Sequence, residues 1–283
     1  MGAKKYAWIA VLAAAWLAIG CADGDSEAQG PAADEGGFAD DDSPAQLAAR
    51  VGGEGTEPAR PVVLVAGLMQ DETTVAPLAD ALRAEGLDVT VWIPPNSGLD
   101  DIHGYAKLLA ETVEEVRRRT LAARVDLVGH SEGGLTARLY VKNAGLDAPV
   151  HTYVALGSPQ QGTEGGTLSQ VLRLIGCEVW APACSQMVAG SAFLEELNGV
   201  DPTPGDVRYV TVATRQDGVV QPVSRAGILG AENVVMQDAC RNRPAVGHFG
   251  LLEDGWVHQV VVAVLAGGRP VGSCRARPIG GVL

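Results

Sequence analysis

Apolar and polar positions along the chain form blocks that predict strands separated by helices. Short apolar runs lie at 62–65, 89–93, 125–128, 150–156 and 207–213, and several end at glycine or proline. Continuous runs of this length are typical of strands buried on both faces of a parallel sheet. Apolar residues at helical spacing occupy about 73–85, 101–119, 133–143 and 252–265. The alternation predicts an α/β fold with a mostly parallel central sheet and helices on both faces.

Some details of these helices follow from individual residues. Thr73 or Thr74 is expected to cap the first helix, and Gly86 to end it. The helix over 101–119 has a predicted buried face, formed by Tyr105, Leu108, Leu109, Val113 and Val116.

The segment from Gly157 to about Gly199 breaks the alternation. Its apolar residues are scattered, at Leu168, Val171, Leu172, Leu174, Ile175, Val179 and Trp180. We expect a small cap at about 163–200 over the carboxyl edge of the sheet, where ligands bind in such folds. A helical insertion that only packs on the domain is the alternative.

The first 20 residues have the pattern of a signal peptide. Lys4 and Lys5 precede an uninterrupted apolar stretch, 7–19, which is short for a membrane span of about 20 residues. The sequence Ala-Ile-Gly-Cys at 18–21 resembles a bacterial lipobox, whose first position is usually Leu. The resemblance implies cleavage before Cys21 and lipidation of its thiol, which would anchor the protein to a membrane. Ordinary signal-peptidase cleavage and an uncleaved anchor are the alternatives.

Residues 21–60 have the composition of a disordered tether. Ten acidic residues and one base, Arg50, lie between Ala22 and Glu57, so this segment carries most of the formal charge of −13. It has few large apolar residues, and we expect it to stay extended by self-repulsion. The folded domain is expected to span 61–283. Nothing in the chain resembles the basic face of a nucleic-acid-binding protein.

The cysteine count agrees with export. The chain contains five cysteines, Cys21, Cys177, Cys184, Cys240 and Cys274. Lipidation of Cys21 would leave four, and exported proteins tend to pair their thiols. Sequence proximity favours Cys177–Cys184 and Cys240–Cys274, although four cysteines allow three pairings. We expect a cell-surface or outer-membrane lipoprotein, or otherwise a secreted protein.

A candidate nucleophile lies directly after the run at 125–128. Gly-His-Ser-Glu-Gly at 129–133 matches the Gly-x-Ser-x-Gly nucleophile elbow. The chain reverses tightly around Ser131, so Gly129 and Gly133 stand where a Cβ would clash with neighbouring backbone. The pentapeptide alone is a weak signal, but a strand before it and a helix after it supply the required context. An ordinary glycine-rich loop is the alternative.

A serine hydroxyl needs a histidine base oriented by a carboxylate, and in α/β-hydrolases the order is Ser, acid, His. The chain has five histidines, His103, His130, His151, His248 and His258. The first three lie too early and His258 falls in the last helix, so His248 is the expected base. Asp217 follows the strand at 207–213 and is the expected acid, with an Asx turn as its alternative role. Asp201, Asp206 and Asp238 are less well placed.

The tetrahedral intermediate of acyl transfer needs two backbone N–H donors. One is expected from Glu132, the residue after the nucleophile, and the other from Leu68 in the loop after the first strand. The Glu132 carboxylate is expected to point away from this site, toward a basic partner.

Several segments together resemble bacterial secreted triacylglycerol lipases and esterases of the class-2 type, in the α/β-hydrolase superfamily. They are Val65–Leu68, Gly129–Leu135, Ala155–Thr163, Gly190–Leu194, Asp217–Pro222 and Gly247–Phe249. The resemblance implies ester hydrolysis through an acyl-enzyme, with Ser131, Asp217 and His248 as the triad. The family usually has His-Gly where this chain has Ala66-Gly67, and often Thr-Pro-His-His where it has Ser158-Pro159-Gln160-Gln161.

The sequence therefore predicts a serine carboxylic-ester hydrolase that acts on acyl esters or lipids as a monomer, with no cofactor, no metal and no nucleic-acid partner. Apolar residues near Leu68, Met69 and 168–180 suggest an acyl pocket. The same triad would suit a polyester or phospholipid hydrolase, or an acyl transferase. A catalytically silent surface lipoprotein is the alternative from another class, and the intact order of the three residues argues against it.

Overall fold

The computed structural model describes residues 60–164, 176–241, 245–272 and 274. The predicted signal peptide, Cys21 and the tether up to residue 59 lie outside the described residues. The same holds for the expected cap residues between Leu168 and Ile175. In the part of the chain that is described, no helix is both long enough and apolar enough to cross a membrane.

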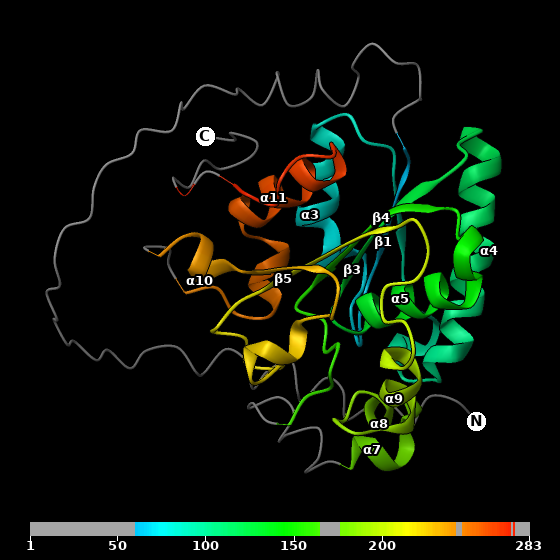
Figure 1. Cartoon of the computed structure of the whole chain (residues 1–283), viewed down its shortest axis with the longest axis vertical. Helices are drawn as coiled ribbons and strands as arrows, with labels where there is room; N and C mark the ends of the chain where they lie inside the picture. Colours follow the sequence, from blue (N-terminus) through cyan, green and yellow to red (C-terminus); the bar gives the residue numbers. More distant parts are fainter. Residues whose placement is uncertain (1–59, 165–175, 242–244, 273, 275–283) are drawn as a thin grey trace, which may run out of the picture. The chain divides into compact units, whose positions relative to one another are not determined.

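A parallel sheet forms the centre of the described domain (Figure 1). Its six strands lie in the order β2-β1-β3-β4-β5-β6. They are β1 (Val62–Val65), β2 (Val89–Trp92), β3 (Val125–His130), β4 (Val150–Leu156), β5 (Arg208–Ala213) and β6 (Glu232–Val235). All five neighbouring pairs are parallel. The predicted α/β fold with a parallel sheet is confirmed.

Helices cover both faces of this sheet (Figure 1). Helices α3 (Glu72–Ala84) and α11 (Gly255–Leu265) lie on one face, and α4 (Ile102–Thr120) and α5 (Glu132–Ala144) on the other. The alternation of side chains along β1 divides the core accordingly. Val62 and Leu64 pack in the cluster of α3 and α11, and Val63 and Val65 in that of α4 and α5. All four are fully buried, which explains why the strand reads as a continuous apolar run.

Three details differ from the sequence predictions. Helix α3 is capped by Asp71, whose carboxylate accepts from the Thr74 backbone N–H, and not by Thr73 or Thr74. Leu108 is 40% exposed because it lies beside the buried stripe of α4 rather than in it. The edge strand β6 was not predicted, since its exposed or half-buried residues show no apolar run.

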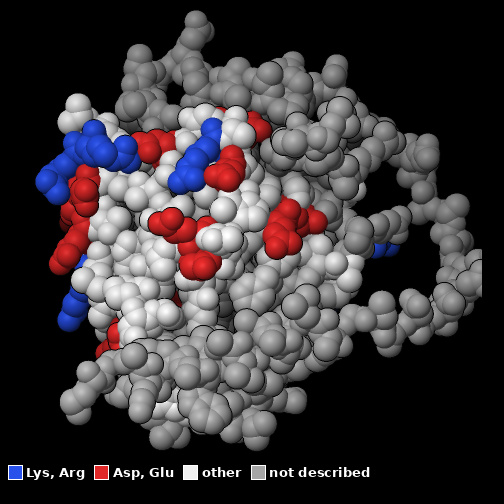
Figure 2. Space-filling model, turned by 180° about the vertical axis from the view of Figure 1, so that it is seen from behind, with Lys and Arg blue, Asp and Glu red and all other residues white. Residues whose placement is uncertain are grey.

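Short elements complete the described domain. The cap region contains α7 (Cys177–Trp180), α8 (Pro182–Gln186) and α9 (Ala192–Asn198). The others are η2 (Pro95–Gly98), η3 (Gly145–Asp147), η4 (Val223–Ala226), α10 (Met236–Ala239) and η5 (Phe249–Leu252). On the face seen in Figure 2, basic side chains lie next to acidic ones, and the described residues there form no continuous basic area.

Candidate active site

Ser131 stands at a sharp turn between β3 and α5. Its backbone angles, φ 57° and ψ −128°, lie in a region that non-glycine residues rarely adopt. A Cβ on Gly129 would lie 2.6 Å from the Gly134 Cα, and a Cβ on Gly133 would lie 2.6 Å from the Ala66 carbonyl oxygen. The two glycines of the pentapeptide are therefore required by the close approach of the helix to the sheet. The turn has the geometry of a nucleophile elbow.

Asp217 and His248 form a buried, hydrogen-bonded pair near the end of β5. The His248 Nδ1 atom lies 2.8 Å from the Asp217 Oδ2 atom, and both side chains are 3% exposed. The other carboxylate oxygen, Oδ1, accepts from the backbone N–H groups of Val219 and Val220, both at 2.8 Å. Burial alone would raise the pKa of the Asp217 carboxyl, but the hydrogen bond and charge of His248 and the two backbone donors lower it. An ionised carboxylate is thus held on one ring nitrogen of His248.

The end of β4 connects this pair with the elbow. The Ser131 backbone N–H donates to the Leu156 carbonyl at 2.9 Å. A Cβ on the next residue, Gly157, would lie 3.2 Å from Asp217 Oδ2 and 3.3 Å from His248 Nδ1. Ser131 and the Asp217–His248 pair therefore border consecutive residues at the end of β4, Leu156 and Gly157. The Ser131 hydroxyl makes no hydrogen bond with the His248 ring here, and in substrate-free enzymes such bonds are often long.

The loop after β1 leaves one backbone donor unused. Gly67 donates its N–H to Gln70 Oε1 at 2.7 Å, Met69 to the Ser97 carbonyl at 2.7 Å, and Gln70 to the Gly67 carbonyl at 3.2 Å. The N–H of Leu68 has no acceptor among the described residues, and neither has that of Glu132 at the start of α5. A Cβ on Gly67 would lie 2.9 Å from the Ser131 Cβ and 3.2 Å from the Glu132 nitrogen, so this loop runs directly beside the elbow.

Two buried residues that the sequence analysis did not assign link this loop to the base. The Gln70 side-chain nitrogen lies 2.5 Å from His130 Nδ1, and His130 Nε2 lies 3.0 Å from the His248 carbonyl oxygen. Burial and the adjacent His248 ring lower the pKa of His130 to about 3, so His130 is neutral and donates from Nε2. The sequence analysis assigned no structural role to His130, and the structure shows one. Its position inside the elbow pentapeptide was the available signal.

Gln70 also accounts for the conformation of the loop that contains Ala66. Its side chain accepts from Gly67 with Oε1 and donates to His130 with Nε2, and it is 3% exposed. The loop with Ala66 is therefore held from within by Gln70.

The expectation for the Glu132 side chain was wrong. Glu132 is 1% exposed, and neither carboxyl oxygen has a hydrogen-bond partner among the described residues. Burial raises the pKa of this carboxyl well above its ordinary value. The N-terminal position on α5 places the side chain against the loop after β1 and against η2, where none of the residues that the structure describes offers a basic side chain.

The rival acids and histidines have other contacts. Asp238 pairs with Arg215, and Asp206 with Arg124. His258 is buried and its Nε2 lies 2.8 Å from the Leu252 carbonyl oxygen, so it is a packing residue.

Both disulfides that sequence proximity favours are present. They join Cys177 to Cys184 and Cys240 to Cys274, with Cα atoms 5.9 and 5.6 Å apart. Cys177 and Cys184 form a small apolar cluster with Leu99 and Ala181, against which Leu68 packs. This disulfide therefore holds the cap region beside the loop that carries the Leu68 donor. Trp180 of the same region is 52% exposed.

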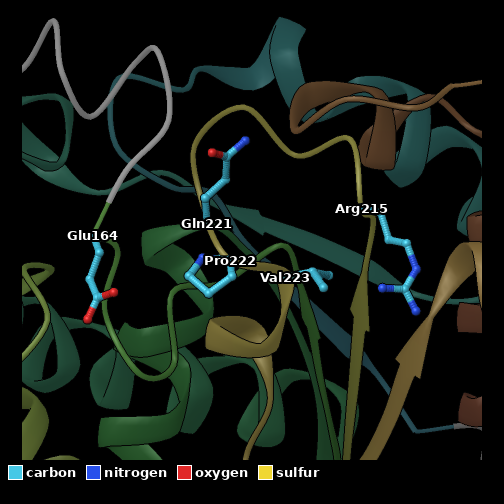
Figure 3. A pocket seen from close by; sticks show the side chains of 5 residues that line it. All are labelled: Glu164, Arg215, Gln221, Pro222 and Val223. Atoms are coloured by element: carbon cyan, nitrogen blue, oxygen red, sulfur yellow. The ribbon is translucent and has the colours of Figure 1, made fainter.

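An open hollow lies beside the segment that follows β5 (Figure 3). It is lined by Glu164, Arg215, Gln221, Pro222 and Val223. Its charged groups are paired, since Glu164 contacts Arg225 and Arg215 contacts Asp238. Among the described residues, no group of three or more metal-ligating side chains lies together.

Comparisons with known proteins show similarity to thioesterases and lipases. A family model described as palmitoyl protein thioesterase matches residues 61–198. The chain is 28% identical over 130 residues to a triacylglycerol lipase of Pseudomonas fragi, an alignment of 46% of this chain and 44% of the relative. The chain thus spans less than half the length of that relative.

Solved structures of lipases share the fold. Aspergillus fumigatus lipase B superposes with a TM-score of 0.62 at 20% identity, over 78% of this chain and 55% of that one. The mature lipase BlEst2 of Bacillus licheniformis has a TM-score of 0.56 at 19% identity, over 75% and 94% of the two chains. With its parallel sheet and nucleophile elbow, the chain has the α/β-hydrolase fold, and about half of it is similar to a bacterial triacylglycerol lipase.

Proposed function

We propose that the protein is a serine carboxylic-ester hydrolase that cleaves acyl esters through an acyl-enzyme. The observation that carries this proposal is the buried Asp217–His248 pair, which lies against Gly157, the residue directly after the one that the Ser131 elbow contacts at the end of β4. The family match and the triacylglycerol lipase relative support the same class of reaction.

In the first half of the reaction, the Ser131 hydroxyl attacks the ester carbonyl carbon while His248 Nε2 takes the hydroxyl proton. Asp217 orients the ring through Nδ1 and stabilises the imidazolium that forms. The N–H groups of Leu68 and Glu132 stabilise the oxyanion, and His248 returns the proton to the departing alcohol. A water molecule then repeats these steps on the acyl-enzyme and releases the carboxylic acid.

A small apolar cluster lies beside the proposed donors. Leu99, Ala181 and the Cys177–Cys184 disulfide are buried in it, and the partly buried Leu68 packs against them. We propose that the acyl group binds against Leu68, so the substrate is an acyl ester with an apolar acid part. A polyester or phospholipid with such an acyl group would fit the same mechanism.

The Ser131→Ala variant tests the nucleophile. It should lose p-nitrophenyl ester hydrolysis by at least 1,000-fold and lose labelling by a fluorophosphonate, because the acyl-enzyme has no other attachment point. The matched control is Ser185→Ala, since Ser185 is exposed and lies outside the triad. Labelling retained in Ser131→Ala would disprove the assignment. A wild-type protein that neither hydrolyses esters nor reacts would favour the silent lipoprotein.

We also propose export and membrane anchoring through a lipidated Cys21, with residues 21–60 as the tether. The two disulfides in the described domain are typical of a protein that folds outside the cytoplasm. Cys21→Ser should move the protein from the membrane fraction to the soluble fraction, and unchanged membrane association would contradict lipidation at this residue.

A further inference from the structure

Glu132 combines full burial with the absence of any described partner. It is the first residue of α5, directly after Ser131, and its side chain is 1% exposed. Both carboxyl oxygens are enclosed and accept no hydrogen bond from a described residue. A buried carboxylate without a cation or donors is far less stable than the neutral acid.

The carboxyl group lies beside the two donors proposed for the oxyanion. A Cβ on Gly98 would lie 2.6 Å from Glu132 Oε2 and 3.0 Å from the Leu68 Cα, so the carboxyl oxygen is close to the Leu68 loop. Its own backbone N–H is the second donor. A charge on Glu132 would therefore act directly on the site where negative charge develops.

The loop that encloses the carboxyl is in a strained conformation. Asn96, Ser97 and Gly98 have φ values of 49°, 56° and 75°, all in the left-handed region. The Ser97 carbonyl accepts from Met69, which ties this loop to the one that carries the Leu68 donor. Strained segments of this kind are common at ligand sites.

The described groups around Glu132 offer no compensating charge. Tyr105 of α4 is a titratable group whose pKa is raised by burial and by the charges of Asp100 and Glu132. Asp100 lies just before that helix and is acidic itself. The Tyr105 hydroxyl is already used, since it donates to the Pro95 carbonyl and accepts from the Asp100 N–H. No described Lys or Arg forms an ion pair with Glu132. The positive end of α5 favours an anion, but this effect is smaller than the cost of burying one.

On the basis of the proposed function, we propose that Glu132 is a positioning residue that acts through its charge. As a neutral acid it leaves the oxyanion site free of negative charge. Its ionisation suppresses ester hydrolysis at alkaline pH. Two unit charges about 6 Å apart, at an effective dielectric constant of about 20, repel enough to slow the reaction roughly 100-fold. The proton goes to solvent, and no group in the site receives it.

Two neutral variants of similar shape, Glu132→Gln and Glu132→Met, test this inference. The pH profile of kcat/KM for p-nitrophenyl esters, corrected with Ser131→Ala, should fall at alkaline pH in the wild type. In both variants the profile should stay level to a higher pH. At the alkaline end their kcat/KM should exceed that of the wild type by at least 10-fold. Glu111→Gln is the matched control because Glu111 is exposed on α4, and its profile should follow the wild type. Tyr105 does not account for such a limb, since burial raises its pKa to about 12.

Difference infrared spectra between wild type and Glu132→Gln give a readout that does not depend on activity. The wild type should show the C=O band of a protonated carboxylic acid at neutral pH, and the band should disappear over the same pH range as the activity. Absence of the band at neutral pH would overturn the proposal. A band together with an unchanged alkaline limb in the variants would overturn the coupling. A wild type that neither hydrolyses esters nor is labelled by a fluorophosphonate would refute the proposed function, and with it the coupling between Glu132 ionisation and hydrolysis. The infrared band would still report the protonation of Glu132.

Discussion

Glu132→Gln should increase the free energy of unfolding, by an amount that grows with pH. The glutamine keeps the size of the side chain and removes its ability to ionise. In the folded state, burial raises the pKa of Glu132 well above its ordinary value of 4.5. Above that pH the folded protein therefore binds more protons at this residue than the unfolded chain does, so wild-type stability falls as the pH rises.

The size of the effect follows from the isolation of this carboxyl. With no described partner for either oxygen, little offsets the burial cost except the positive end of α5, which contributes about 0.3–1 kcal/mol. Each pH unit above the unfolded-state pKa costs the wild type about 1.4 kcal/mol while Glu132 stays neutral in the folded state. The difference from Glu132→Gln therefore grows with pH over this range, and above the folded-state pKa it becomes constant.

Urea unfolding of both proteins, followed by tryptophan fluorescence between about pH 5 and 8, measures this difference. Other titrating groups, such as His130, are common to both proteins and cancel in the comparison. Glu111→Gln should show no pH-dependent difference, because Glu111 is exposed. A difference between wild type and Glu132→Gln that is the same at every pH would refute the reasoning, since it would mean that Glu132 is ionised in the folded state.

Two further predictions concern contacts near the site and at the end of the chain. Gln70→Leu removes the side chain that holds the Gly67 N–H and His130. The value of kcat/KM should therefore fall about 10- to 100-fold, with a smaller loss of fluorophosphonate binding. Unchanged kinetics would show that the loop keeps its conformation without Gln70. Replacing both Cys240 and Cys274 with serine opens a link of sequence separation 34 and should cost about 2–4 kcal/mol in urea unfolding, whereas an unchanged midpoint would contradict a stabilising role.

The order of strands and helices could be predicted from the sequence because it depends on local patterns. The run Val62–Val65 is fully buried, and the spacing of Leu109, Val113 and Val116 matches the buried face of α4. The edge strand β6 could not be predicted, because an edge strand with one partner needs no buried face. Its place in the sheet is decided by pairing with β5.

Candidate residues for catalysis were also accessible from the sequence, since the elbow has its own turn chemistry and the chain order limits the acid and the base. Ser131, Asp217 and His248 are separated widely in sequence, and the structure shows Asp217 and His248 in contact at 2.8 Å. That contact depends on the segment before η5 lying against the end of β5, where Thr214 donates to the Val246 carbonyl, and no local pattern specifies this.

The sequence by itself determined the α/β architecture, the turn at Ser131 and the pairs of cysteines that lie near each other along the chain. Only the tertiary structure decided the surroundings of these residues. Gln70 meets His130 across 60 positions of sequence, and Glu132 is enclosed by a loop that precedes it by more than 30. Burial and hydrogen-bond partners arise from such distant contacts, and they determine whether a carboxyl near the nucleophile is charged.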